Sequence, residues 1–519
     1  MSQKFDVAIV GFGPVGAVAA ALLGQAGLRV HVCDRMADVH EIPRAIALDH
    51  EILRVFQELG VATEVLMHCE PFTPSEYTGV DGQVIKRMTM VDPPFPQGYT
   101  PSMVFTQPPV ERILRARVAA LPQVEVSLES TLVGLTQNDE GVTLTLSDSS
   151  GQTCRVNADW VIGCDGGGSK VRSLLGIALE DLDFDEPWLV VDALVNERGL
   201  AKLPKTSVQY CEPERPCTFV IGPGNHRRWE ISLKPGEDPT DAATAEGTWK
   251  LLSRWMSPDD GTLWRQSSYR FHALVAEQWR VGRVFLAGDA AHMQPPFLGQ
   301  GMCQGIRDVK NLSWKLIDVL RGIATGDLAQ GLLDSYGTER QGHVRELTSR
   351  LKQVGSVICE RDIDTARARD TRLLAECGGV VKDQPRQDIL PPLTEGLLSS
   401  QSSLGRGELF PQPRLVGGQL MDEYFGYGWR LVASGAPLPS SVPPGITTVC
   451  LAVGPHGDVG GILDAWLTRH SCVYALVRPD HYVFGTATTL SALNSLFAEW
   501  LQIFGDMAKH FDRQRVHFS

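Results

Sequence analysis

Hydrophobic residues near the N-terminus fall into two short runs separated by a glycine-rich turn and a helical segment. Val7–Val10 is a short apolar run of the kind that forms a buried parallel strand. Gly11–Gly16 interrupts it, Ala17–Gln25 is rich in Ala and Leu, and Arg29–Cys33 has the pattern of a second strand. This order predicts a strand–helix–strand unit. Asp49–Leu59, with apolar residues on one face, predicts an amphipathic helix.

The middle of the chain changes from alternating to continuous apolar patterns. Residues 124–161 alternate polar and apolar positions between turn-forming clusters, which predicts an antiparallel meander. Asp159–Cys164 and Arg283–Ala287 return to the buried-strand pattern, and Asp308–Leu320 has the spacing of a helix with one apolar face. Residues of about 180–275 are strand-like and rich in aromatic side chains, so we expect a second sheet there.

A change of composition marks the last part of the chain. Residues near 383–415 are rich in Pro, Ser, Gly and Gln, which predicts a linker. The remainder alternates strand and helix patterns again. The predicted strands are Thr447–Val453, Cys472–Val477 and Tyr482–Gly485, and the predicted helices are Ile462–Arg469 and Thr489–Phe504.

Composition narrows the class of protein. The 519 residues are 43% hydrophobic and 21% charged, which suits an enzyme with several structural units. The net charge of −13, from 48 basic and 61 acidic residues, argues against nucleic acid or an anionic membrane as partner. The 11 cysteines form no CxxC pair or zinc-finger spacing. We therefore expect free thiols in a cytoplasmic protein, with no metal site.

The first turn carries a dinucleotide-binding fingerprint. Gly11-x-Gly13-x-x-Gly16 lies between a strand and a helix, and Asp34 ends the next strand. Such glycines let backbone N–H groups approach a pyrophosphate, and the carboxylate can accept hydrogen bonds from a ribose. The neighbours Pro14, Val15 and Arg35 are further cofactor-binding candidates. An enzyme that binds only NAD(P) could carry the same single fingerprint.

Two further motifs separate these alternatives. Gly163-Cys-Asp165-Gly166-Gly-Gly-Ser169-Lys-Val-Arg172 follows a buried strand, and Leu286-Ala-Gly288-Asp289-Ala-Ala-His292 leads into Pro295-Pro296-x-x-Gly299-Gln-Gly301-Met302. With these motifs the sequence resembles the group A flavoprotein monooxygenases, the relatives of para-hydroxybenzoate and phenol hydroxylases. The resemblance implies that the Asp165 segment touches FAD and the reductant, and that Asp289 holds the ribityl chain of FAD.

More cofactor residues follow from the resemblance. Arg44 matches an arginine that lies near FAD in the family, and Gln107 matches a glutamine that contacts the ribityl chain. The turn that opens the helix after Gly299 offers N–H groups and a positive dipole end to reduced flavin. The cofactor candidates in this region are Gly288, Asp289, Pro296, Gly299, Gly301 and Met302.

The segments Pro43–Arg54, Gly299–Lys315 and Val477–Asp480 resemble the 3-(3-hydroxyphenyl)propionate hydroxylases most closely. This similarity implies a mixed α/β fold. We expect a Rossmann-like FAD-binding domain at 1–180 and 266–385, with substrate-side β segments near 70–105. An interleaved substrate-binding β-sheet domain would span 181–265, a linker 386–410 and a thioredoxin-like C-terminal domain 411–519. Without a CxxC, that last domain is predicted to be structural or to support a homodimer.

Catalytic candidates are less well defined. A base near the phenol hydroxyl would favour hydroxylation. Asp49 matches an acidic active-site residue of phenol hydroxylases, but it could equally cap the helix that follows it. His50 and Tyr269 are the other catalytic candidates, and Tyr210, Arg228 and Pro296 are the substrate-binding candidates.

The resemblance implies an FAD-dependent monooxygenase that hydroxylates a small phenolic compound with NADH or NADPH and dioxygen, through a flavin hydroperoxide. We expect hydroxylation ortho to the hydroxyl of a phenol like 3-(3-hydroxyphenyl)propionate. A halogenated phenol, a heteroaromatic or a polyketide remains an alternative substrate. A flavin dehydrogenase or reductase on the same scaffold is the alternative activity.

Overall fold

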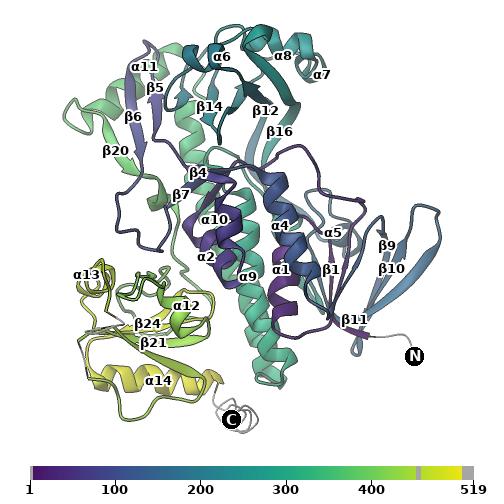
Figure 1. Ribbon diagram of the computed structural model, residues 1–519, viewed down its shortest axis with the longest axis vertical. Helices are drawn as coiled ribbons and strands as arrows, with labels where there is room; N and C mark the ends of the chain where they lie inside the picture. The colour runs from purple at the N-terminus through teal and green to yellow at the C-terminus, as the bar shows by residue number, and fades with distance from the viewer. Residues whose placement is uncertain (1–3, 436, 452–456, 505–519) are drawn as a thin grey trace.

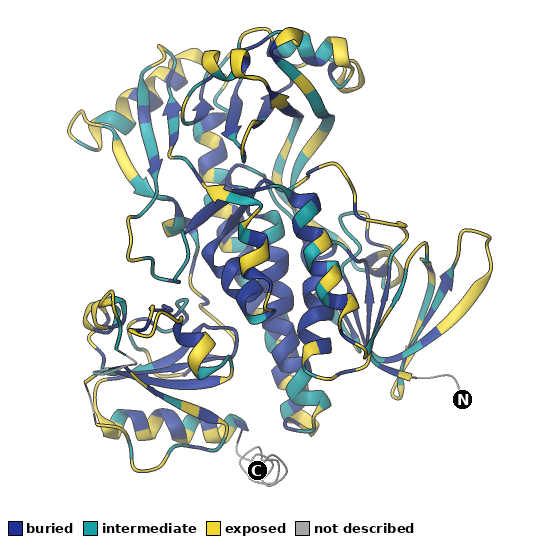
Figure 2. Ribbon diagram, in the orientation of Figure 1, coloured by how far each residue is buried: buried dark blue, intermediate teal, exposed yellow. Residues whose placement is uncertain are grey.

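A computed structural model describes residues 4–435, 437–451 and 457–504. Figure 1 shows two large sheets, one at the lower right and one at the top, with long helices between them and a separate C-terminal unit at the lower left. The central helices α1 (Pro14–Gln25), α9 (Gly301–Leu320) and α10 (Gly326–Ile358) are largely buried (Figure 2). No helix in the described ranges is both long and apolar enough to cross a membrane.

The first sheet confirms the predicted Rossmann-like unit. β1 (Lys4–Val10) pairs in parallel with β2 (Val30–Cys33) and with β11 (Thr153–Gly163), and β11 pairs in parallel with β18 (Val284–Leu286). The other strands of this sheet are β8 (Val124–Ser127), β9 (Thr131–Asn138), β10 (Gly141–Ser147) and β17 (Arg280–Val281).

The predicted meander over 124–161 is correct only for its later part. β9, β10 and β11 pair antiparallel, but β8 pairs in parallel with β2. The reason is the crossover helix α4 (Gln107–Ala119), which precedes β8 and brings the chain back in the same direction. Helices α1 and α4 pack side by side beside this sheet.

The second sheet confirms the strands predicted over about 180–275 and adds distant segments to them. Its order is β19-β16-β12-β15-β14-β13-β5-β6-β20. The strands are β5 (Ser75–Thr78), β6 (Val84–Thr89), β12 (Leu179–Val195), β13 (Ser207–Tyr210), β14 (Cys217–Ile221), β15 (His226–Ser232), β16 (Gly261–Ala276), β19 (His292–Met293) and β20 (Lys382–Pro385).

Shorter elements connect these sheets. A small sheet contains β3 (Ala47–Asp49), β4 (Cys69–Pro71) and β7 (Ser102–Phe105). The helices are α2 (His50–Glu58), α3 (Ala62–Leu66), α5 (Lys170–Leu174), α6 (Glu197–Lys202), α7 (Pro239–Ala242), α8 (Ala245–Leu252) and α11 (Ile363–Ala375). The 3-10 helices are η1 (Pro258–Asp260), η2 (Gly288–Ala290) and η3 (Arg386–Ile389).

Part of the segment that was predicted to form a linker pairs with the second sheet. β20 pairs in parallel with β6, and η3 follows it directly. Arg386, Leu393 and Ser399 are buried within the predicted linker of residues 386–410. This segment therefore contributes side chains to the interior of the protein, a property that its composition did not indicate.

The C-terminal unit has the predicted thioredoxin-like alternation. β21 (Trp429–Ala433) was not predicted, but β22 (Ile446–Cys450), β23 (Tyr474–Val477) and β24 (Val483–Ala487) fall in the expected segments. The helices are α12 (Met421–Phe425), α13 (Ile462–Arg469) and α14 (Leu490–Phe504). The end of the predicted strand Thr447–Val453 lies outside the described residues.

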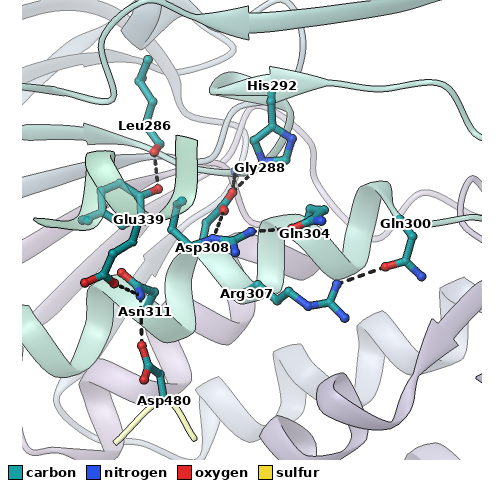
Figure 3. A network of polar contacts seen from close by, with 12 residues as sticks. Leu286, Gly288, His292, Gln300, Gln304, Arg307, Asp308, Asn311, Glu339 and Asp480 are labelled. Carbon is teal, nitrogen blue, oxygen red and sulfur yellow. Dashed lines mark hydrogen bonds and ion pairs between the residues drawn. The ribbon is translucent and has the colours of Figure 1, made fainter. Parts of the chain in front are cut away.

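The C-terminal unit is joined to the central helices by buried contacts. Trp314 of α9 packs in one hydrophobic cluster with Trp429 and Trp500. Asn311 of α9 donates hydrogen bonds to Glu339 of α10 (2.6 Å) and to Asp480 of the C-terminal unit (2.9 Å), as Figure 3 shows. Apolar packing and a buried polar network thus fix this unit against α9.

Candidate active site

A cavity of about 350 Å³ is lined by residues of the second sheet and of the loops that follow strands of the first sheet. One part of its lining, here named the cofactor wall, comes from the predicted cofactor motifs. The cofactor wall consists of Gly13, Pro14, Val15, Arg44, Gln107, Cys164, Gly166, Gly288, Asp289, Pro296, Gly299, Gly301 and Met302. Motifs nearly 300 residues apart in the sequence therefore meet at one site.

The three fingerprint glycines have different tasks. Gly11 has a φ of +103°, and a Cβ there would lie 2.3 Å from the carbonyl oxygen of Cys164. A Cβ at Gly16 would lie 1.9 Å from the carbonyl oxygen of Gly11. A Cβ at Gly13 would meet no atom within 4 Å. Gly11 and Gly16 thus permit close backbone packing, and Gly13 leaves open space at the start of α1, where an anionic group of a cofactor fits.

Asp34 and Arg35 do not line the cavity. The Asp34 carboxylate accepts hydrogen bonds from the backbone N–H groups of Phe12 (2.6 Å) and Met36 (2.8 Å). Asp34 therefore connects the fingerprint turn to the end of β2. Its binding of a ribose, and a cofactor contact of the exposed Arg35, stay predictions.

Asp289 is the acidic residue of the cofactor wall. It lies deep in the protein, and burial raises the pKa of its carboxyl. Its side chain nevertheless opens onto the cavity and has no hydrogen-bond partner among the described residues. An acceptor that faces the cavity without a protein partner fits the hydroxyl groups of a ribityl chain. With the open space at Gly13, this arrangement suits FAD.

Arg44 and Gln107 are held together at the cavity wall. The Oε1 atom of Gln107 accepts hydrogen bonds from the backbone N–H groups of Arg44 (2.8 Å) and Ala45 (2.7 Å). The Arg44 side chain is exposed to the cavity. Gln107 thus fixes the loop that presents Arg44, and both residues could contact a cofactor.

Asp165 has a different environment from Asp289. Its carboxylate accepts hydrogen bonds from Ser169 Oγ (2.5 Å) and from the N–H groups of Lys170 (2.6 Å) and Val171 (3.1 Å). It therefore caps α5. Its neighbours Cys164 and Gly166 reach the cavity instead.

Figure 3 shows how α9 holds the turn before Asp289. The carboxylate of Asp308 accepts a hydrogen bond from the Gly288 N–H (3.0 Å) and lies 2.7 Å from Nε2 of His292. Arg340 of α10 contacts its other oxygen at 2.9 Å. Burial by itself would raise the pKa of Asp308, but His292 and Arg340 lower it overall. His292 thus has a structural role, bonded to Asp308 and stacked on Trp279.

A second part of the lining, here named the substrate wall, is one face of the second sheet and the side chains beside it. It consists of Phe72, Val190, Gln209, Thr218, Val220, Arg228, Glu230, Arg265, Tyr269, Phe271, Phe297, Leu298 and Arg386. Strand alternation explains the selection, because residues two apart share a face. Arg228 and Glu230 of β15 face the cavity, whereas Trp229 and Ile231 between and beyond them belong to a hydrophobic core.

The same alternation corrects the prediction for Tyr210. Gln209 lines the cavity, and Tyr210, the next residue of β13, faces the opposite side of the sheet. Its ring packs against Trp255, whose Nε1 donates a hydrogen bond to the Tyr210 hydroxyl (3.1 Å). Tyr210 is therefore a core residue of the second sheet and does not reach the substrate wall.

Arg228 lines the cavity as predicted, but an aspartate compensates its charge. Nε and Nη2 of Arg228 donate to the two oxygens of Asp192, at 2.7 and 3.0 Å. Nη1 donates to the carbonyl oxygen of Arg44 (2.9 Å). Arg265 also approaches Asp192, with 3.6 Å between Nη1 and Oδ2. Arg228 thus connects the second sheet to the loop of the cofactor wall and has little charge left for a ligand.

Asp49 and His50 lie outside the cavity lining. One oxygen of Asp49 caps α2 by accepting from the N–H groups of Glu51 (3.1 Å) and Ile52 (3.3 Å). The other accepts from Nη2 of Arg307 at 2.5 Å. Burial lowers the pKa of His50 to about 4. The helix-cap interpretation of Asp49 thus describes its contacts, and neither side chain reaches the site where a phenol would bind. Of the catalytic candidates, Tyr269 does line the cavity.

Two ionisable groups of the substrate wall were missed by the sequence analysis. Glu230 is buried, and its carboxylate has no hydrogen-bond or ion-pair partner in the described part of the chain. Burial raises the pKa of Glu230 to about 7, although Arg228 opposes the shift. Arg386, from the predicted linker, is the second. For Glu230 a signal existed, because β15 places charged residues at alternating positions of a strand.

Comparisons with known proteins agree with this site. A family model described as an FAD binding domain matches residues 4–351. A probable NADH-specific resorcinol 4-hydroxylase of Rhodococcus jostii is 36% identical, over 96% of this chain and 94% of that relative. A 3-(3-hydroxy-phenyl)propionate/3-hydroxycinnamic acid hydroxylase of Burkholderia cenocepacia is 32% identical over 93% of each chain.

The chain belongs to this FAD-binding family. It is an FAD-dependent aromatic hydroxylase, which decides against an enzyme that binds only NAD(P). The crystal structure of the flavin-dependent monooxygenase PieE, in complex with FAD and substrate, has a TM-score of 0.79 at 20% identity, covering 97% of this chain and 100% of PieE. At that identity the likeness shows the fold, and it confirms the predicted fold class.

Proposed function

We propose that this enzyme hydroxylates a single-ring phenol that carries a second substituent in the meta position, ortho to the phenol hydroxyl, with NADH as reductant. Both relatives are named for such phenols, since resorcinol and 3-(3-hydroxyphenyl)propionate are meta-substituted. The observation that carries the proposal for this chain is Glu230, an unpartnered carboxyl that faces an aromatic-lined cavity opposite the FAD motifs.

Bound FAD supplies the redox chemistry, accepting hydride from NADH and activating dioxygen. In the overall reaction a ring C–H becomes C–OH, the second oxygen atom leaves as water, and NADH becomes NAD⁺. Gly13 and Asp289 would hold the cofactor, and Arg44 and Gln107 would border it. Phe72, Tyr269 and Phe271 surround the ring with apolar surface, which limits the access of water.

Glu230 would act as the base. Its carboxylate accepts the proton of the phenol hydroxyl, which makes the ring more electron-rich at its ortho and para positions. With a pKa of about 7, the group changes protonation near neutral pH, where a catalytic base is most effective. The orientation of the ring in the cavity then selects between ortho and para carbon atoms.

Oxygen consumption driven by NADH tests the proposal. Resorcinol and 3-(3-hydroxyphenyl)propionate, and benzene analogues without the hydroxyl, would be added separately to the FAD-loaded enzyme. We expect one of the meta-substituted phenols to accelerate NADH oxidation and to yield an ortho-hydroxylated product in proportion to the NADH used. If only halogenated phenols, heteroaromatics or polyketides were hydroxylated, the substrate proposal would be wrong. NADH oxidation without any hydroxylated product would favour a reductase.

Two further properties belong to this proposal. We infer a cytoplasmic location, supported by the 11 cysteines, all of them free thiols. Dioxygen and a small aromatic compound are the partners that the cavity accommodates. A homodimer formed through the C-terminal unit is the assembly to test by light scattering.

A further inference from the structure

Arg386 is a buried cation that the second sheet carries to the cavity. β20 pairs with β6 in parallel register, from Lys382 opposite Lys86 to Pro385 opposite Thr89. Arg386 follows β20 at once as the first residue of η3 and has a relative exposure of 5%. Strand pairing therefore fixes the backbone on which the guanidinium is mounted, and its side chain lines the cavity.

Uncharged groups hold the guanidinium of Arg386. Nε donates to Ser102 Oγ (3.1 Å), and Nη2 donates to the carbonyl oxygen of Leu298 (2.7 Å). The guanidinium lies 4.1 Å from the centre of the Phe72 ring. Its third nitrogen, Nη1, has no hydrogen-bond partner among the described residues. Three contacts thus orient the fork and leave the terminal nitrogen Nη1 without a partner in the described part of the chain.

Other buried arginines of this protein have carboxylate partners. The ion pairs are Arg54–Asp422, Arg228–Asp192, Arg265–Asp192, Arg307–Asp49, Arg340–Asp308, Arg369–Asp370, Arg430–Asp422 and Arg478–Glu339. Arg172 lacks an ion pair but donates through both terminal nitrogens to carbonyl oxygens. In the described part of the chain, Arg386 alone combines burial, an unpaired charge and a free donor at the cavity.

An unpaired buried charge is unfavourable unless a ligand compensates it. Burial lowers the pKa of Arg386 to about 10, so the group stays protonated at neutral pH. Removing a guanidinium from water without a counter-ion is strongly unfavourable, and the native structure has to offset this cost elsewhere. A planar donor fork that is already oriented is well suited to an oxyanion, because little side-chain entropy is lost on binding.

We propose that Arg386 determines substrate specificity by binding an anionic oxygen of the aromatic substrate through Nη1. The inference rests on the proposed function and names the chemistry of the second substituent. The oxyanion has two sources, a carboxylate on a side chain or the oxygen of an ionised ring hydroxyl. Because Nη2 holds the Leu298 carbonyl, a ligand on Nη1 lies beside the loop that leads to Gly299 and the flavin.

Ligand binding without NADH tests this role in the FAD-loaded enzyme. Dissociation constants would be measured from changes in flavin absorbance for resorcinol, 3-(3-hydroxyphenyl)propionate and the methyl ester of that acid. In Arg386→Met we expect anion binding to weaken about 10- to 100-fold, as expected for a lost hydrogen bond to a charged group. Arg386→Lys keeps the charge without the fork, so its loss should be smaller.

The ligands separate the two sources. If the carboxylate is bound, only the acid weakens, and the ester and resorcinol keep their affinities. If an ionised ring hydroxyl is bound, all three weaken together, and the loss grows as the pH approaches the phenol pKa. Lys382→Met is the matched control, because it removes an exposed cation of β20 that does not line the cavity. It should change each dissociation constant less than about twofold.

A purely structural role predicts a different result. Arg386→Met that retains FAD and binds all three ligands as the wild type does would overturn the proposal. If Arg386→Met does not fold, Arg386→Lys decides, and unchanged affinity for every ligand in that variant would overturn it too. The dissociation constants are measured without NADH and therefore do not depend on catalytic turnover. Failure of the proposed function would appear instead as ligands that bind normally while no phenol is hydroxylated.

Discussion

The cofactor wall and the substrate wall of the cavity use different parts of the polypeptide. On the cofactor wall, glycines and loop backbones leave space, and Asp289 is the acidic side chain that faces it. On the substrate wall, side chains from alternating strand positions carry the chemistry, with Glu230 and Arg386 unpaired and Arg228 neutralised by Asp192. One wall is shaped by backbone conformation and the other by a balance of buried charges.

The two walls should therefore respond differently to amino-acid substitutions. A backbone cradle tolerates changes in side chains that point away from it, whereas a buried charge balance fails when one partner is lost. Arg228 and Arg386 illustrate this within one wall. Arg228 has Asp192 beside it and holds the structure together, whereas Arg386 has no carboxylate partner in the described part of the chain and is available to bind a ligand. Substitutions that disturb charge should therefore affect the substrate wall most.

The largest effect is expected from Asp192→Asn, which leaves Arg228 and Arg265 without their carboxylate in the interior. Breaking such a buried pair costs about 3–5 kcal/mol of the free energy of unfolding. Asp185→Asn is the matched control on the same strand, because its ion pair with Arg270 is exposed to solvent and contributes little to stability. Denaturant unfolding of both variants measures the difference. Equal stabilities would contradict the charge-balance description of this wall.

The next largest effect is expected from Glu230→Gln. Activity should fall about 100-fold or more, as is typical when a general base is removed. The ionised carboxylate is the basic form, so wild-type kcat should rise with pH through about 7 and fall as the group is protonated. The Gln variant should lack this limb of the pH profile while it keeps FAD. A variant with wild-type rates and an unchanged pH profile would remove Glu230 from the mechanism.

The sequence predicted the cofactor wall well because its motifs are contiguous. A turn that needs glycine at fixed positions leaves the same local pattern wherever it occurs, as at Gly11 and Gly16. Asp289 lies three residues beyond the end of β18, and its role was expected from the resemblance of its motif to the family. The fold class followed from these motifs together with the alternating helices and strands. Asp34 and Asp165 show the limit, since a motif gives the position of a carboxylate but not its hydrogen-bond partners.

The substrate wall was poorly predicted because its residues meet only through strand pairing. Val190, Thr218 and Glu230 are neighbours across three strands, in the register Val190–Glu230–Thr218. Gln209 faces the cavity, and Tyr210, one residue later, faces the opposite side of the sheet. The sequence alone does not show which of the two faces the cavity. Arg386 lies in a segment whose composition indicated a linker. Local patterns contain no information about such long-range pairing.

Asp289→Ala tests the cofactor wall. It removes the acidic side chain that faces the cavity from that wall, and the lost hydrogen bonds to a charged acceptor should weaken FAD binding about 10- to 100-fold. The purified variant should be largely colourless, measured as flavin absorbance per protein. Asp464→Ala, at an exposed position of α13, is the control and should keep its FAD. Full flavin content in Asp289→Ala would contradict the assignment.

The smallest effect is expected outside both walls, from Cys450→Ser together with Cys472→Ser. Cys450 is exposed on β22 and Cys472 is buried before β23, and burial raises the pKa of the Cys472 thiol to about 11. A thiol with so high a pKa is almost wholly protonated at neutral pH and is a poor nucleophile. If electrons pass only through the cavity, the double variant should keep kcat within about twofold, measured as NADH-driven hydroxylation. Its melting temperature serves as the control for folding, because replacing buried Cys472 can lower stability without touching the chemistry. A folded double variant that has lost turnover would show that the C-terminal unit takes part in electron transfer, and the redox chemistry would then not be confined to the two walls.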